Sequence, residues 1–234
     1  MTNKRNPVFI MVLVAIITLS AYFMHQTRTV ETFGLATASK VIVIDPGHGG
    51  FDPGKKGING EDEKHINLKI ALKLRNYLQQ SGAVVIMTRT TDDDADGIEG
   101  KGHKKADMNK RRLISDSSEA DILVSIHQNS FPQRNAKGAQ LFYHKKSEGG
   151  KLLAEFIQKS IKENADKWNR RTPKSNSDYY VLRATKAPAV IVECGFLTNP
   201  GEEYLLNTDR YQDVIAWSIY LGIVEYFESI EGQQ

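Results

Sequence analysis

The sequence predicts one α/β domain built on a mostly parallel, twisted sheet of about six strands with helices on both faces, preceded by an N-terminal transmembrane or signal segment. Two observations lead to this fold class. Short runs of β-branched and aliphatic residues, bounded by glycine, proline or polar residues, are typical of buried parallel strands, and they occur at 41–44, 84–87, 122–126 and 189–192. Helical patterns separate these runs, and such alternation indicates a doubly wound α/β fold.

The remaining elements follow in order along the chain. A glycine-rich loop at 45–60 follows the first strand. Over the next segment, 62–80, apolar residues recur every four positions, as on a helix face packed against a sheet: Ile66, Ile70, Leu74 and Leu78. After the second strand we expect, in chain order, a polar loop at 91–105, a short helix at 107–118, the strand that ends at His127, a strand at 139–143, a helix at 149–164, a strand at 179–182, the strand that ends at Glu193 and a final helix at 210–229.

Length and composition restrict the class of protein. The chain has 234 residues, and without an N-terminal segment it suits one compact domain of about 190 to 200 residues. Its formal net charge of +3 is close to neutral, so nothing points to nucleic acid as a partner. Cys194 is the one cysteine, which excludes an intramolecular disulfide and a thiolate cluster. A metal site in this chain must therefore use histidine and carboxylate ligands.

The N-terminal segment has the pattern of a targeting signal. Pro7 to Met24 is an uncharged stretch of 18 residues, preceded by Lys4 and Arg5. This length just reaches that of a membrane-spanning helix and exceeds the apolar core of a signal peptide, so we favour an anchor that places the rest of the chain outside the cytoplasm. The pattern Ala36-Thr37-Ala38 leaves a cleaved signal peptide as the alternative. We therefore divide the chain into an anchor or signal peptide at 1–28, a polar tether at 29–39 and the folded domain at 40–230.

Residues able to bind a metal or move a proton stand where three expected strands end. His48 closely follows the first strand, and two later strands end on His127 and Glu193. The carboxyl ends of parallel strands meet at one edge of a sheet, where ligands bind. We therefore expect two imidazoles and a carboxylate to converge there, as a metal hydrolase requires.

A hydrolytic zinc site needs three protein ligands and an open position for water, and His48 and His127 supply two. The start of the expected helix offers four candidates for the third: Glu61, Asp62, Glu63 and His65. At about 100° per residue, Glu63 lies in line with the apolar helix face, whereas His65 points about 200° away, toward solvent. The first turn of a helix also favours an anion. We therefore predict Glu63 as the third ligand.

Glu193 has two interpretations, a fourth ligand or the base that takes a proton from a metal-activated water. A fourth ligand would close the position that the water needs. A carboxylate at a strand end, beside the apolar Phe196-Leu197, has surroundings that raise a carboxyl pKa toward the range suited to acid–base catalysis. We therefore favour the catalytic role for Glu193.

Other residues have simpler interpretations. The loop glycines lack the spacing of a nucleotide-binding motif, so we interpret them as allowing the backbone to turn sharply around the metal. Cys194 has no apparent partner histidine, which favours a packed thiol over a nucleophile. We expect His103 and His144 to be surface histidines. The basic stretch Lys101 to Arg112 is either a solvated surface or a contact for an anionic polymer.

Together these residues resemble a known family. Four motifs occur in the order found in the amidase-3 type of zinc N-acetylmuramoyl-L-alanine amidases: Val43-Ile44-Asp45-Pro46-Gly47-His48-Gly49-Gly50, Glu63-Lys64, Ser125-Ile126-His127-Gln128-Asn129, and Val192-Glu193-Cys194-Gly195-Phe196-Leu197-Thr198-Asn199-Pro200. The resemblance covers about residues 40 to 228, and Arg89 and Arg111 also fall where the family commonly has arginines. The four motifs together are highly specific, whereas the histidine motifs alone would be weak.

The resemblance implies hydrolysis of the amide between the lactyl group of N-acetylmuramic acid and the L-alanine of the peptidoglycan stem peptide. It also implies one zinc ion (Zn2+) per chain. Matched residue by residue, the motifs imply these roles: zinc ligands His48, Glu63 and His127, catalytic Glu193, and substrate-binding Asn129 and Arg89.

The single short domain behind an apolar N-terminus, and the stretch Ile98 to His103, are most similar to the germination-specific subgroup of this family. That similarity implies a role in the developing spore envelope, on the way to muramic-δ-lactam in the cortex. The expected partners are the glycan and stem peptide of peptidoglycan, and the sequence leaves open whether a secreted accessory protein must also bind. Gln128 stands where many relatives carry alanine, a difference at the pocket wall.

Two rival functions share the same residues. A zinc carboxypeptidase or endopeptidase of peptidoglycan would be compatible with this ligand set, so the family motifs alone favour the amidase. A catalytically silent wall-binding protein would be expected to have lost some of the four site residues, which this chain retains.

Overall fold

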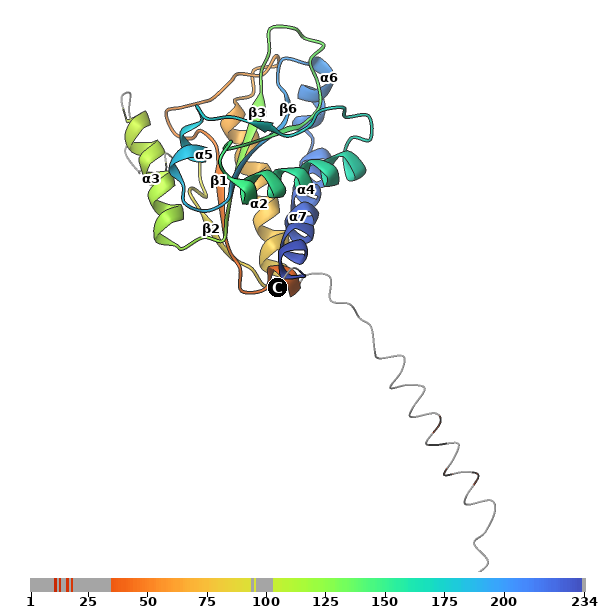
Figure 1. Ribbon diagram of the computed structural model, residues 1–234. Helices are drawn as coiled ribbons and strands as arrows, with labels where there is room; N and C mark the ends of the chain where they lie inside the picture. The colour runs from red at the N-terminus through yellow and green to blue at the C-terminus, as the bar shows by residue number, and fades with distance from the viewer. Residues whose placement is uncertain are drawn as a thin grey trace, which may run out of the picture. The chain divides into compact units, whose positions relative to one another are not determined.

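A computed structural model describes residues 35–93, 95 and 103–232 and, nearer the N-terminus, residues 11, 13, 16 and 18 only (Figure 1). The chain forms two units, Met1–Phe33 and Gly34–Gln234, and the second contains the folded domain. Within these described ranges, no helix has the length and apolar character needed to span a membrane. The expected anchor and the stretch 98–102 lie largely outside the described residues, so what we expect of them stays a prediction.

One six-stranded sheet forms the centre of the domain, as predicted. Its strands are β1 (Val41–Pro46), β2 (Val84–Met87), β3 (Ile122–Asn129), β4 (Gln140–Tyr143), β5 (Lys174–Ser175) and β6 (Ala189–Phe196). They lie in the spatial order β2-β1-β3-β6-β4-β5. All neighbouring strands are parallel except β4 and β6, which pair antiparallel.

Helices cover both faces of this sheet (Figure 1). They are η1 (Leu35–Thr37), α2 (Glu63–Gln80), α3 (Lys104–Ser117), α4 (Glu148–Asn164), α5 (Tyr180–Ala184), α6 (Pro200–Leu206) and α7 (Asp209–Glu231). α2, α4 and α7 contribute to one core cluster together with Ile42 and Ile44 of β1, whereas α3 and α5 contribute to another together with Val43. Successive side chains of β1 therefore enter opposite cores, because side chains alternate along a strand. Since both faces of β1 are buried, its residues 41–44 are all apolar.

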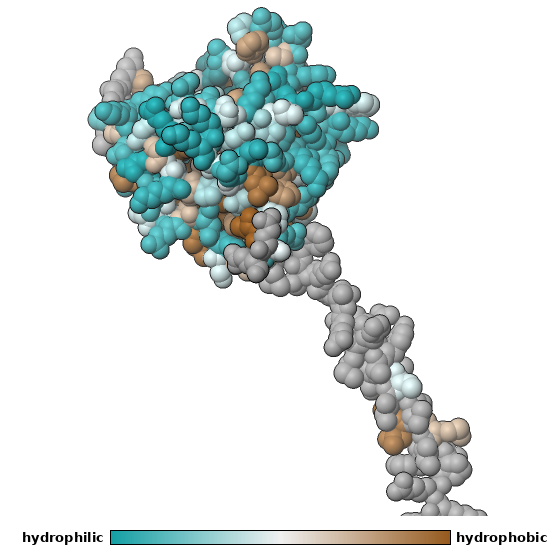
Figure 2. All heavy atoms as spheres, viewed as in Figure 1, coloured by the Kyte–Doolittle hydropathy of each residue, from teal (hydrophilic) through white to brown (hydrophobic). Residues whose placement is uncertain are grey.

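The domain surface in Figure 2 is mostly hydrophilic, with apolar residues scattered over it. The strand residues Ile42, Val43 and Ile44, by contrast, are completely buried. This distribution fits a domain whose apolar residues are used in its own two cores.

The segment predicted as a strand at 179–182 is instead part of the helical turn α5, so that prediction is wrong. Asn176 redirects the chain just before it, since its Oδ1 accepts hydrogen bonds from two following backbone N–H groups, at 2.7 and 3.0 Å. The edge position beside β4 is taken by the two-residue strand β5. Val181 and Leu182 are buried against the sheet, so their apolar character reflects helix packing rather than strand pairing.

Two helices also differ from the predictions. α3 begins at Lys104 rather than at 107, and α6 was not predicted. Asn199 caps α6 by accepting hydrogen bonds from the N–H groups of Gly201 (3.0 Å) and Glu202 (3.2 Å), and Pro200 occupies the first turn. Asn as the cap and Pro just inside are ordinary start signals, but α6 has only 7 residues, too few for a clear helical period.

The last part of the predicted tether packs against the domain. Ala36 and Thr37 are buried, and the Thr37 hydroxyl lies 2.7 Å from Ser81 Oγ and donates to the Ser81 carbonyl at 3.3 Å. The folded domain therefore includes residues from η1 onward. The alternative cleavage pattern at 36–38 lies within this packed segment.

Candidate active site

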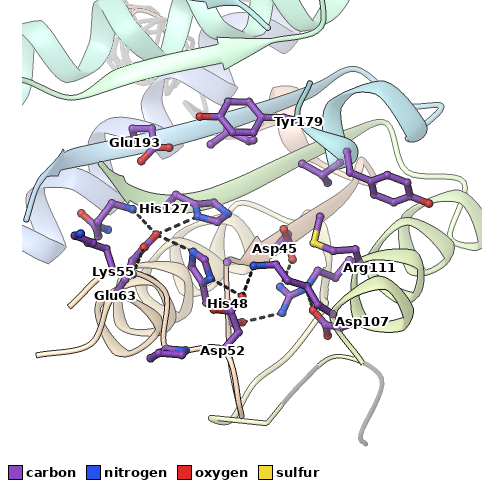
Figure 3. Close-up of a pocket in the computed structure, with 18 of the residues that line it drawn as sticks. Asp45, His48, Asp52, Lys55, Glu63, Asp107, Arg111, His127, Tyr179 and Glu193 are labelled. Carbon is purple, nitrogen blue, oxygen red and sulfur yellow. Dashed lines mark hydrogen bonds and ion pairs between the residues drawn. The ribbon is translucent and has the colours of Figure 1, made fainter. Parts of the chain in front are cut away.

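The carboxyl ends of β1, β3 and β6 adjoin one cavity of about 650 Å³ (Figure 3). His48 follows β1, and Glu63 is the first residue of α2. The sheet register places His127 of β3 beside Glu193 of β6. All four side chains line the cavity, at the edge where parallel sheets bind ligands.

Three donor atoms converge in this cavity. Glu63 Oε1 lies 3.3 Å from His48 Nε2 and 3.1 Å from His127 Nδ1. The three side chains offer ligand atoms that all lie within 4.8 Å of one another, and the two imidazole rings meet edge to face with centroids 5.0 Å apart. Two imidazole nitrogens and a carboxylate oxygen gathered in this way are able to hold a metal ion.

The groups around Glu63 stabilise its ionised carboxylate. Its Oε2 accepts the backbone N–H of Lys55 at 2.9 Å, and its Oε1 accepts that of Gln128 at 3.0 Å. Burial alone would raise the pKa of Glu63, but hydrogen bonds and charge from His127 and His48 outweigh it and hold the pKa well below its usual range. In return, although burial lowers the pKa of His48, hydrogen bonds to carboxylates raise it to about 9. The cluster therefore favours a cation between its side chains.

Glycine at two positions lets the loop close around these side chains. A Cβ on Gly47 would lie 2.2 Å from the His127 ring, and a Cβ on Gly54 would lie 2.6 Å from Glu63 Oε2. Gly54 also has φ +69°, a conformation that favours glycine. These close approaches support the interpretation that the glycines turn the backbone around the cluster.

A buried ion pair supports the backbone at His48. Arg111 donates from Nη1 to Asp45 Oδ1 and from Nη2 to the His48 carbonyl, both at 2.7 Å. Burial raises the pKa of Asp45, but Arg111 and hydrogen bonds from Ser125 and Thr88 outweigh burial and lower it to about 2. His48 has φ +60°, which is strained for a residue with a Cβ. The Arg111–Asp45 ion pair therefore stabilises the loop at His48, the residue with the unfavourable backbone conformation.

Glu193 lies beside the cluster in a different electrostatic setting. It is 8% exposed, and its Oε2 has no hydrogen-bond partner among the described residues. Burial raises the pKa of Glu193 to about 7, with His127 opposing the shift and Glu63 adding to it. A carboxyl group with this pKa exchanges its proton near neutral pH, so it is suited to acid–base chemistry.

The two predicted substrate-binding residues lie in different places. Asn129 ends β3 and lines the cavity, and its Oδ1 accepts the backbone N–H of Ser130 at 2.7 Å. Arg89 is 5% exposed and lies outside the cavity lining. Its guanidinium donates to the carbonyls of Pro46 (3.0 Å) and Gly47 (3.1 Å), as well as to those of Thr91 and of Lys64 in the first turn of α2. Arg89 therefore stabilises the loop, and its contact with substrate stays a prediction.

Other histidines lie apart from the three-residue cluster. The side chain of His65 is 39% exposed, with Nδ1 3.3 Å from Glu61 and Nε2 3.4 Å from Asp92, so it faces away from the cluster as the helical phase predicted. His103 lines the cavity, although we expected a surface histidine there; only the packing of α3 against the sheet reveals this. His144 is partly exposed and lies outside the cavity lining.

Cys194, the residue that follows Glu193 in the chain, is completely buried. Burial raises the pKa of its thiol well above the usual range, and Sγ lies 3.6 Å from the Val192 carbonyl. A thiol in this setting is not available as a thiolate, which agrees with a packed cysteine.

The cavity residues that were not predicted include Asp52, Lys55 and Tyr179. In Figure 3, Asp52 lies next to His48, whereas Tyr179 lies on the side of Glu193. Asp52 follows His48 by four residues, a spacing that was visible in the sequence. Tyr179 reaches the cavity only because α5 is a helix on this face of the sheet.

Comparison with known proteins agrees with this site. The model of the N-acetylmuramoyl-L-alanine amidase family, amidase-3, matches residues 42–225. The germination-specific N-acetylmuramoyl-L-alanine amidase of Bacillus subtilis is 36% identical over 222 residues, which cover 94% of this chain and 93% of that protein.

Solved structures extend the similarity to the fold. The CwlD amidase from Clostridioides difficile, solved in complex with the GerS lipoprotein, is 39% identical with a TM-score of 0.76, over 82% of this chain and 100% of that chain. An N-acetylmuramoyl-L-alanine amidase from Clostridium difficile 630 is 35% identical with a TM-score of 0.72, over 82% and 98%. With the cluster, the sheet and these matches in agreement, the chain belongs to the amidase-3 family and is an N-acetylmuramoyl-L-alanine amidase.

Proposed function

We propose that this amidase is zinc-dependent, with His48, Glu63 and His127 as the ligands and Glu193 as the catalytic base. The bond cleaved joins the lactyl group of N-acetylmuramic acid to the L-alanine of the stem peptide. The observation that carries the proposal is the pairing of a three-donor cluster with a buried carboxylate that has an unpartnered oxygen in the same cavity.

The donor set fits zinc. Two imidazole nitrogens and one carboxylate oxygen are a known ligand set of hydrolytic zinc sites, in which the fourth position stays open for water or substrate. Calcium and magnesium sites are built from oxygen ligands instead. Glu193 offers its carboxylate beside the cluster but is not one of the three clustered donors, so it would be available for proton transfer.

When bound, zinc supplies Lewis acidity, which polarises the amide carbonyl and acidifies water. Glu193 then acts as the proton carrier. Its carboxylate takes a proton from the attacking water as the new C–O bond forms, and it returns that proton to the L-alanine nitrogen as the C–N bond breaks. Burial raises the pKa of Glu193 to about 7 in the metal-free cavity, and a raised carboxyl pKa suits a group that acts first as base and then as acid.

Asn129 is proposed as a substrate contact. Its Oδ1 is used by the Ser130 N–H, which leaves the side-chain amide nitrogen as a donor for a substrate carbonyl. Its position at the end of β3, two residues beyond His127, supports this role.

The biological setting is proposed as the spore cortex, in an extracytoplasmic and membrane-anchored form, with the glycan and stem peptide of peptidoglycan as partners. The similarity to a germination-specific amidase supports the cortex and the route to muramic-δ-lactam. The complex of a similar amidase with a lipoprotein supports a secreted accessory protein. Packing of Ala36 and Thr37 into the domain supports an anchor over cleavage at Ala36–Ala38, because cleavage there would remove buried contacts.

Mass spectrometry of purified cortex and vegetative peptidoglycan, after digestion by the full-length chain, tests this function. The amidase releases intact stem peptides and leaves the glycan strands uncut. A zinc peptidase would instead shorten stem peptides that stay attached to muramic acid. A wall-binding protein would give the same products as a buffer control. Either of these two results would overturn the proposal.

A further inference from the structure

His48 lies between two carboxylates, and each of its ring nitrogens contacts one of them (Figure 3). Nε2 lies 3.3 Å from Glu63 Oε1, inside the three-residue cluster, while Nδ1 lies 3.0 Å from Asp52 Oδ2. The second contact has no part in the ligand set proposed above. It bears, however, on which nitrogen of His48 carries the lone pair that binds a metal.

A neutral imidazole carries one N–H and one lone pair, and only the nitrogen with the lone pair coordinates a metal. A carboxylate at Nδ1 keeps the proton on that nitrogen, because the carboxylate accepts the hydrogen bond. The lone pair is then on Nε2, which faces the cluster. Such carboxylate partners also fix the ring orientation and raise ligand basicity.

Asp52 is itself held in place without His48. Its Oδ1 accepts the backbone N–H of Gly54 at 3.1 Å, and its Oδ2 lies 3.0 Å from Lys104 Nζ. Its backbone pairs with Gly49 through two hydrogen bonds, at 3.0 and 2.8 Å. Contacts with the loop and with the first residue of α3 therefore fix the position of the Asp52 carboxylate independently of its contact with the His48 imidazole.

We propose that Asp52 is a positioning residue of this amidase: it fixes the tautomer and ring orientation of His48 so that Nε2 binds the zinc ion. Lys104 supports it from α3, with a smaller effect because its side chain is 72% exposed. This inference rests on the zinc site proposed above, and it adds a residue outside the ligand set.

The chain contains a matched control. Glu61 also contacts one histidine four residues away, His65 at 3.3 Å, and one lysine, Lys69 at 3.8 Å. It therefore repeats the contacts of Asp52, but its histidine does not belong to the cluster. Replacing Glu61 removes a carboxylate close to the cluster without removing a contact to any of the three proposed zinc ligands.

The test is the zinc Kd of the full-length chain, measured by competition with a chromophoric chelator. Asp52→Ala should raise the Kd about 10- to 100-fold, the usual effect of losing such a partner. Asp52→Asn keeps an acceptor without the charge and should raise it about 3- to 10-fold. Lys104→Ala should raise it about fivefold or less, and Glu61→Ala should leave it unchanged. The melting temperature of each metal-free variant checks folding.

Two outcomes overturn different claims. If His48→Ala binds zinc as tightly as the unaltered chain, the proposed ligand set fails. If His48→Ala loses zinc while Asp52→Ala and Asp52→Asn bind it normally, the ligand set stands and the role of Asp52 is wrong. Should Asp52→Ala not fold, Asp52→Asn alone decides, since a normal Kd in that variant contradicts the inference.

Discussion

Glu63 and Glu193 line the same cavity and are almost equally buried, at 3% and 8% exposure, yet their pKa values move in opposite directions. Glu63 accepts backbone hydrogen bonds on both oxygens and faces two histidines. Glu193 has an oxygen without any partner among the described residues. Burial is common to both, so the donors around each carboxylate decide whether it is held as an anion or takes up a proton near neutral pH.

The secondary structure explains where those donors come from. Glu63 begins α2, where the helix dipole favours an anion, and its two backbone donors come from other segments. Lys55 lies in the loop before α2, and Gln128 lies in β3 where the sheet register shifts. Glu193 lies on an inner strand and pairs with His127 of β3 on one side and Gln140 of β4 on the other. Backbone N–H groups in such a ladder are already used between strands, so few remain for its side chain.

Removing Glu63 should have the largest effect. Glu63→Ala leaves two ligands, which is too few for tight zinc binding in a three-ligand site, so zinc and amide cleavage should both be lost. His65→Ala, which alters the same helical turn outside the cluster, should keep both. Zinc content by atomic absorption decides, and loss of zinc from His65→Ala but not from Glu63→Ala would make the ligand assignment wrong.

Glu193→Gln should affect turnover but not metal content. The amide keeps the size of the side chain and removes its basic oxygen, so kcat should fall about 10²- to 10⁴-fold, the usual contribution of general acid–base catalysis. Zinc stoichiometry should equal that of the unaltered chain. Weakened zinc binding, with activity partly restored by excess metal, would instead identify Glu193 as a fourth ligand.

The same variant should be more stable than the unaltered chain when both are metal-free at pH 8. The pKa of Glu193 in the folded protein, about 7, lies above the usual glutamate value of 4.5. Its contribution to stability is therefore fully present below pH 4.5 and is lost as the pH rises through 7. Gln has no such loss, so Glu193→Gln should gain up to about 3 kcal/mol at pH 8 relative to pH 4. Urea unfolding at both pH values measures the difference, and a gain that does not depend on pH would contradict the raised pKa.

Cys194→Ala should have the smallest effect on catalysis. The thiol follows Glu193 in the chain but is completely buried, with a raised pKa, so kcat should stay within about twofold while stability falls by about 1 kcal/mol for the lost packing. Activity assays before and after thiol alkylation of the unaltered chain provide a second check. Loss of most activity in the folded variant would require a thiol mechanism.

Local patterns in the sequence were sufficient for five of the six strands and for the cluster. Apolar runs predicted four of the six strands closely, and a shorter pattern predicted β4. The ends of the parallel strands placed His48, His127 and Glu193 at one edge, and helical phase separated Glu63 from His65. These predictions succeeded because strand and helix periods are set by neighbouring residues.

Contacts between distant segments decided the rest. Val181 and Leu182 have strand-like character, but the sheet edge is occupied and they pack as α5. Arg89 donates to the carbonyls of Pro46 and Gly47, contacts that no local pattern predicts. The protonation of Glu193 depends on which donors reach it from other strands. Sequence therefore determined which residues meet at the sheet edge, and tertiary structure determined what each does there, because hydrogen bonds and burial depend on neighbours that are far apart in the chain.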